Sequence, residues 1–198
     1  MEGSEVYKSY IKDIDMNKMK LALLVAGSLV AGASTSAFAE GQGTVTFTGK
    51  LITETCEIVG DKDQTVALDA VSIKTLDASG KEGGFKAFNI TVKCPVQANP
   101  AEFNEVGIHF EPVGSTTPWD PATGNLKNNT QGGAENVQIK IYNTNDGVQS
   151  HAKIGDVSKW LPGSTGEHIF NYAGGYYASG ATTAGDVSAK VMYTLVYK

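Results

Sequence analysis

Apolar and polar residues alternate along most of the chain that follows residue 40. Within residues 86–94, for example, the apolar side chains share one face of an extended chain: Phe88, Ile90, Val92 and Cys94. This period of two is the pattern of a half-buried β-strand. The pattern recurs in further segments, which we expect to form strands: 106–110, 137–142, 168–178 and 187–198.

Weaker signals complete the predicted fold. We expect a first strand at 51–59, a short strand at 65–68, and either a strand or one helical turn at 71–76. Residues 145–147, with the sequence Asn-Asp-Gly, predict a hairpin turn. Residues 112–136 are rich in Pro, Gly, Asn and Thr and are expected to be irregular. Roughly six to eight short strands without a helical period predict a one-domain, all-β antiparallel sandwich.

One alternating segment has two interpretations. Residues 43–49 have the sequence Gly-Thr-Val-Thr-Phe-Thr-Gly, in which Val45 and Phe47 lie on one face of an extended chain. Gly43 and Gly49 fall on the same face. The segment is either the first strand of the domain or a strand that pairs with a different molecule, and the residues alone leave this open.

A secretory signal peptide is expected at residues 16–39. A short basic region precedes an apolar run at 21–33, and the segment ends in an Ala-Phe-Ala cleavage pattern. The apolar run is shorter than the roughly 20 residues that a membrane-spanning helix needs. We therefore expect an exported mature chain that begins at Glu40 and has no membrane insertion. Residues 1–15 are interpreted as an upstream extension that comes from a misplaced start site or from cloning.

The chain has two cysteines, Cys56 and Cys94. An exported protein folds in an oxidising compartment, so we expect the pair to form one disulfide. Two buried free thiols are the alternative. The chain-entropy model assigns about 4 kcal/mol of stabilisation to a cross-link that closes a loop of this length.

Charge and composition argue against several classes of function. The net charge is −5 and all 16 basic residues are lysines, which disfavours a nucleic-acid partner and an anionic membrane surface. His109 is expected on the outer face of a strand, and His151 and His168 in loops, without metal-ligand spacing. Trp119 and Trp160 can stack on sugars, although packing is the more common role. No motif indicates a catalytic site, a metal or a cofactor, and we expect that the protein is not an enzyme.

Several motifs occur in a fixed order along the mature chain. They are Gly43 to Gly49 leading to Cys56, Phe88-Asn89-Ile90 leading to Cys94, Phe170, Tyr176-Tyr177-Ala178, and a penultimate Tyr197. Their joint order resembles the pilin subunits of the chaperone–usher pathway of Gram-negative bacteria, the type 1 and P fimbrial family. The resemblance covers residues 40–198.

The resemblance implies an incomplete immunoglobulin-like sandwich at residues 51–198 that lacks its last strand. The resulting groove is lined by Val187, Ala189, Val191, Tyr193, Leu195 and Tyr197. The resemblance also implies that residues 40–50 form a donor strand for a neighbouring subunit. The groove-facing residues of that strand are Gly43, Val45, Phe47 and Gly49, the last at a point where the two backbones approach closely.

The function implied by the resemblance is that of a structural subunit of an adhesive fimbria on the cell surface. The subunit passes through the periplasm with a chaperone, reaches an outer-membrane usher, and polymerises head-to-tail with identical or related pilin subunits by donor-strand exchange. The alternatives are a minor adaptor or a tip adhesin subunit that binds host carbohydrate, and a secreted hydrolase. A single domain with an N-terminal donor-type strand favours a shaft or adaptor subunit over a two-domain adhesin.

Overall fold

The computed structural model describes residues 43–53, 55–96, 101–114 and 118–198. Three expected features lie outside the described residues: the upstream extension at 1–15, the signal peptide at 16–39 and the first donor residues at 40–42. The chain divides into two units, Met1–Gly49 and Lys50–Lys198, and each is described by itself.

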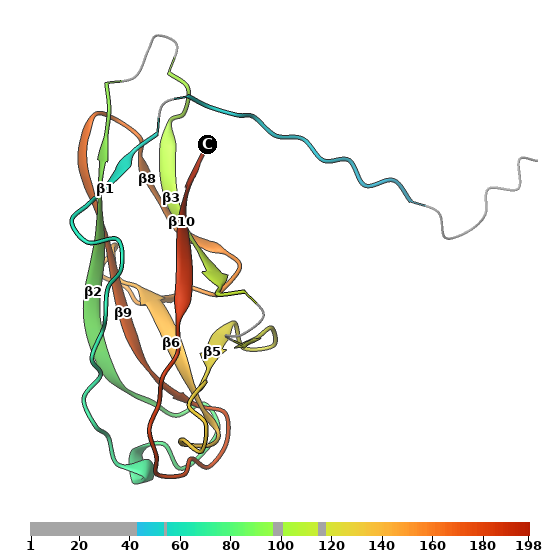
Figure 1. Cartoon of the computed structure of the whole chain (residues 1–198), viewed down its shortest axis with the longest axis vertical. Helices are drawn as coiled ribbons and strands as arrows, with labels where there is room; N and C mark the ends of the chain where they lie inside the picture. Colours follow the sequence, from blue (N-terminus) through green and yellow to red (C-terminus); the bar gives the residue numbers. More distant parts are fainter. Residues whose placement is uncertain (1–42, 54, 97–100, 115–117) are drawn as a thin grey trace, which may run out of the picture. The chain divides into compact units, whose positions relative to one another are not determined.

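Strands of the second unit form two sheets, and every pairing between described strands is antiparallel (Figure 1). The larger sheet contains, in spatial order, β1 (Glu57–Val59), β2 (Glu82–Cys94), β9 (Gly166–Ala178), β6 (Val137–Asn143), β5 (Asn125–Lys127) and β4 (Trp119–Asp120), with β7 (Ser150–His151) beside β6. The smaller sheet contains β10 (Val191–Tyr197), β3 (Glu105–Pro112) and β8 (Val157–Pro162). The predicted all-β antiparallel class is confirmed.

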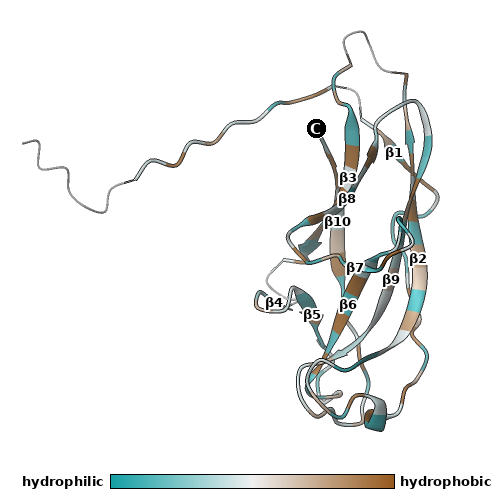
Figure 2. Ribbon diagram, turned by 180° about the vertical axis from the view of Figure 1, so that it is seen from behind, coloured by the Kyte–Doolittle hydropathy of each residue, from teal (hydrophilic) through white to brown (hydrophobic). Residues whose placement is uncertain are grey.

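Aromatic side chains connect the two sheets through the core. Tyr172 of β9 is completely buried. Its ring centre lies 5.5 Å from that of Phe88 in β2 and 5.0 Å from that of Phe110 in β3, on the opposite sheet. Figure 2 shows the alternation of hydrophobic and hydrophilic positions along β2. Such alternation turns one face of each strand to the core, so the sequence pattern directly determines the sandwich.

Two strand predictions near the start of the domain are wrong in extent. β1 has only three residues, and the segment 65–68 forms no strand. The segment belongs to neither sheet, and the residues on either side of it contact β2 through side chains, Gln64 with the carbonyl of Asn89 and Asp69 with Lys86. Residues 71–76 contain one turn of 3-10 helix, η2 (Ile73–Thr75), capped by Ser72, which confirms the second of the two predicted alternatives.

The stretch at 112–136, expected to be irregular, contains the short strands β4 and β5. A polar network holds them against β6: the buried Asn125 donates a hydrogen bond of 3.0 Å from Nδ2 to Gln138 Oε1. Because polar side chains stabilise these strands, they lack the apolar alternation that would have predicted them. The hairpin at 145–147 is confirmed, since it connects the paired strands β6 and β7.

Candidate functional site

The C-terminal strand β10 lies at an edge of the smaller sheet and has one strand neighbour, β3. The register pairs Tyr193 with Phe110 and Leu195 with Ile108. Both β3 residues are at most 1% exposed, whereas their β10 partners are only half-buried. Side chains that are paired in register point to the same side of a sheet. The core therefore covers this row of inward side chains on β3 (the β3 column) completely. It leaves the adjacent row on β10 (the β10 column) partly open to solvent.

We call this half-buried set the C-terminal face: Val187, Ala189, Val191, Tyr193, Leu195 and Tyr197. The last five pack against the hydrophobic core, and Val187 and Ala189 precede β10 in the chain. All six predicted groove residues are thus half-buried, whereas Ser188, Lys190, Met192 and Thr194 between them are exposed. The free edge of β10 leaves backbone N–H and C=O groups without a strand partner, which is the condition for adding a strand.

Two tyrosines of the C-terminal face reach the segment that begins at the first cysteine. Tyr193 Oη donates a hydrogen bond of 2.7 Å to the carbonyl of Lys62, and the backbone N–H of Cys56 donates one of 3.0 Å to Tyr197 Oη. These bonds run from side chain to backbone, and no strand pairing connects β10 to β1. Side-chain bonds, and not a strand ladder, therefore join the segment at 56–62 to β10.

Burial raises the pKa of both tyrosine hydroxyls on the C-terminal face. For Tyr193, the nearby carboxylate of Asp63 adds to the rise in pKa. For Tyr197, hydrogen bonds with the Cys56 backbone and the Thr55 side chain partly oppose it. Both hydroxyls therefore stay protonated at neutral pH and are able to donate.

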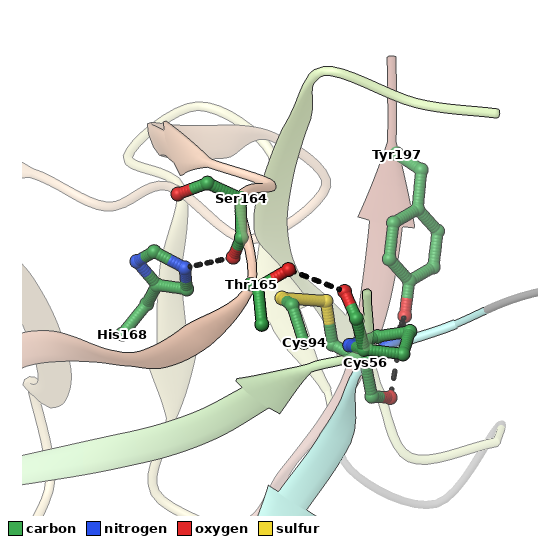
Figure 3. The surroundings of a disulfide bond; sticks show 7 residues. Cys56, Cys94, Ser164, Thr165, His168 and Tyr197 are labelled. Carbon is green, nitrogen blue, oxygen red and sulfur yellow. Dashed lines mark hydrogen bonds between the residues drawn. A yellow bond between two sulfur atoms is a disulfide. The ribbon is translucent and has the colours of Figure 1, made fainter. Parts of the chain in front are cut away.

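The predicted disulfide between Cys56 and Cys94 is present, with an S–S distance of 1.99 Å. It joins the residue before β1 to the last residue of β2, and both cysteines are buried. Figure 3 shows Tyr197 directing its hydroxyl group toward Cys56 beside this disulfide. The disulfide therefore fixes the backbone to which the C-terminal strand is bonded.

The predicted donor residues lie in the first unit of the chain. The described residues from Gly43 to Gly49 form no strand and are exposed, with Val45 76% and Phe47 90% exposed. The second unit begins at Lys50, whose Nζ donates a hydrogen bond of 2.7 Å to the carbonyl of Glu102. Thr53 donates two further bonds of 2.8 Å to the carboxylate of Glu102. Glu102 thereby holds the start of the domain, a role that nothing in the sequence indicated.

Histidine positions differ in part from the prediction. His109 lies on β3, as expected, but His151 and His168 lie in β7 and β9 and not in loops. Burial, together with the charge of Lys140, lowers the pKa of His151. No group of three or more His, Cys, Asp or Glu side chains suited to a metal ion occurs in the described parts of the chain.

Both tryptophans pack within the fold. Trp119 packs against the hydrophobic core. Trp160 lies over the backbone of Gly107, where an added Cβ would lie 3.0 Å from Trp160 Cε3. The ammonium of Lys198 is 4.5 Å from the centre of the same ring. These contacts support the packing role of the tryptophans.

A sequence model of the fimbrial protein family matches residues 45–198. This chain belongs to the fimbrial protein family. The fimbrial chain is 37% identical to the F17 fimbrial protein of Escherichia coli over 177 residues, which cover 86% of this chain and 95% of the relative. It is 35% identical to the major fimbrial subunit SMF-1 of Stenotrophomonas maltophilia over 185 residues, which cover 88% and 99%.

A solved chaperone–usher pilus, whose structure concerns rod uncoiling, shares the fold of this fimbrial subunit. The TM-score is 0.57 at 22% identity, with 80% of this chain and 97% of that chain covered. The fold is therefore the incomplete immunoglobulin-like sandwich of pilins. The protein is a structural subunit of a pilus, an extracellular component, and not an enzyme. None of the helical segments in the described residues has the length and apolarity to cross a bilayer.

Proposed function

We propose that this fimbrial subunit polymerises head-to-tail by donating residues 40–50 to the C-terminal face of the next subunit. The observation that carries the proposal is the half-buried apolar column on β10 beside a fully buried column on β3. The exposed alternation of Val45 and Phe47 supplies a segment of matching chemistry. An added strand would pair with the free edge of β10 and cover the open column, which is β-augmentation.

The direction of the contact determines the assembly. A donor segment and an acceptor face are different surfaces of one chain, so each contact is heterologous. Two subunits in contact still have one donor segment and one acceptor face free for further subunits. The product is an open filament. We propose that Gly43 and Gly49 accompany Val45 and Phe47 at the contact. An added Cβ at Gly49 would meet no atom within 4 Å in the subunit itself, so packing within the subunit does not require this glycine, and we propose that it permits close backbone approach to the neighbouring subunit.

We also propose two transient partners and a route. Residues 16–39 would direct export to the periplasm, where a chaperone would cover the C-terminal face before an outer-membrane usher assembles the filament. An exposed apolar face on an edge strand is a site of aggregation, which is the physical reason for a chaperone. Expressing the mature chain with and without the chaperone tests this, and a version lacking residues 40–49 controls for self-insertion. A soluble, stable monomer of the shortened chain would argue against a chaperone requirement.

The central experiment is Phe47→Asp with Thr46→Asp as its matched control. The two substitutions add the same charge at adjacent positions that lie on opposite faces of an extended segment. A carboxylate in an apolar contact costs several kcal/mol, so Phe47→Asp should abolish filaments in electron microscopy while the disulfide and the subunit's own fold remain intact. Thr46→Asp should still assemble. Unfolding of the Phe47→Asp subunit, or equal assembly by both variants, would contradict the proposal.

A further inference from the structure

The side-chain amide of Asn128 uses its full hydrogen-bonding capacity at the start of the C-terminal face. Nδ2 donates bonds of 2.9 Å to the carbonyl of Ala134 and 3.0 Å to the carbonyl of Asp186. Oδ1 accepts bonds of 3.1 Å from the backbone N–H of Thr130 and 3.0 Å from that of Ser188. An amide has two donors and two acceptor sites. One side chain thus ties the 128–134 loop to the residues on both sides of Val187.

Backbone contacts reinforce this junction. The N–H of Asn129 donates 2.8 Å to the carbonyl of Ser188, and the N–H of Ala134 donates 3.0 Å to that of Asp186. A Cβ added to Gly133 would lie 2.4 Å from the oxygen of Asp186. The loop and the 186–188 segment therefore lie backbone against backbone, which explains a glycine at residue 133.

At this junction, residues 186–188 are bonded to a loop and not to a strand. β10 pairs with β3 only from Val191 onward, and residues 186–188 are bonded to the 128–134 loop instead. The position of Val187, the first residue of the C-terminal face, is consequently set by the loop and not by the sheet. Without the Asn128 amide, Asp186 and Ser188 would each lose a hydrogen bond that fixes the backbone beside Val187.

We infer that Asn128 is a positioning residue for strand uptake: it holds the first part of the C-terminal face in the conformation that a donor strand requires. The inference rests on the proposed function. Asn128 acts through Asp186 and Ser188, with no contact to the donor itself. Preforming the face removes an ordering step from the uptake reaction, so loss of the amide should slow uptake more than it destabilises the domain.

The test measures uptake of a fluorescent peptide with the sequence of residues 40–52. The acceptor is the full mature chain carrying Phe47→Asp, which cannot act as a donor, diluted from denaturant with its disulfide intact. Asn128→Ala removes all four amide bonds, and Asn128→Asp keeps the two accepted bonds and loses the two donated ones. Asn145→Ala is the matched control, because the Asn145 amide also bonds the backbone, at Asn171, but in the β6–β7 turn.

We expect uptake by Asn128→Ala to be about tenfold slower than by the parent, the effect of about one net hydrogen bond to a positioned backbone. Asn128→Asp would turn a carboxylate oxygen toward the carbonyls of Ala134 and Asp186, so it should also take up peptide more slowly than the parent, and it decides the matter if Asn128→Ala does not fold. Asn145→Ala should lower the thermal midpoint without slowing uptake. The inference would be overturned if Asn145→Ala slowed peptide uptake as much as Asn128→Ala does at the same loss of thermal midpoint. It would also be overturned if both Asn128 variants took up peptide at the rate of the parent. A parent that takes up no peptide would instead refute the proposed function itself.

Discussion

Tyr193 Oη donates its hydrogen bond to the carbonyl of Lys62 across 131 positions of sequence. The bond crosses between two edge segments that no strand pairing joins, so Tyr193→Phe should loosen them. We expect a loss of about 0.5–1.5 kcal/mol in the free energy of unfolding, toward the lower end because water can replace the bond at this exposed carbonyl. Urea denaturation of the peptide-complemented subunit measures the change. Unaltered stability would show that the bond is not maintained in solution.

The buried phenol of Tyr172 should determine part of the alkaline stability. Burial raises its pKa from 10.0 to about 12. Because the pKa is higher in the folded state than in the unfolded state, the protonated phenol stabilises the fold in full below about pH 10. This stabilisation is lost as the pH rises from about 10 to about 12. The Tyr172 hydroxyl lies near Ser158, yet it lacks a hydrogen-bond partner within the described residues. Tyr172→Phe should therefore keep or raise stability at pH 7 and flatten the alkaline decline in thermal midpoint. A steeper decline would contradict this.

Removing the disulfide should be strongly destabilising. Replacing Cys56 and Cys94 together by alanine releases a cross-link between residues 38 positions apart. The chain-entropy model gives a loss of about 4 kcal/mol, a large part of the roughly 5–15 kcal/mol that stabilises a typical domain. Guanidinium denaturation of the donor-complemented subunit measures the loss. A change below about 1 kcal/mol would mean that the unfolded chain already keeps these residues close together.

Gly107 tests the packing of the outer face of the smaller sheet. A Cβ at this position would lie 2.6 Å from Val157 Cγ1 and 3.0 Å from Trp160 Cε3. Gly107→Ala should displace the indole, shift the tryptophan fluorescence and cost about 1–3 kcal/mol. Gly174→Ala is a useful control, because its added Cβ meets a single carbon at 4.0 Å. If both variants show the same fluorescence, the Trp160 ring does not rest on Gly107.

Alternation was sufficient to predict the strands that pack directly on the core. The apolar face of residues 86–94 became the inner face of β2, with Ile90, Val92 and Cys94 at most 2% exposed. The pattern could not predict where a strand ends, because that depends on a partner. Residues 65–68 alternate but are paired in no sheet, and Val187 belongs to the apolar pattern although its neighbours Asp186 and Ser188 are bonded to a loop.

The candidate site was predictable in its apolar part and hidden in its polar part. The six residues of the C-terminal face follow from alternation combined with family resemblance. The partners of Tyr193, Glu102 and Asn128 lie 131, up to 52 and up to 60 positions away in the chain. No local pattern encodes contacts over such separations, since they arise from the register of strands distant in sequence. The roles of the donor residues stay predictions until the Phe47→Asp experiment is done.

The bond between Tyr197 and Cys56 joins residues 141 positions apart, whereas Cys56 and Cys94 are separated by 38. We expect the disulfide to form after export, in an oxidising compartment, and both of its cysteines precede β10 in the chain. The cross-link can therefore form without the last strand, whereas the Tyr197 bond requires it. The subunit's own share of the sandwich therefore depends on its penultimate residue, and a chain terminated before β10 would lack the strand that is proposed to accept a donor.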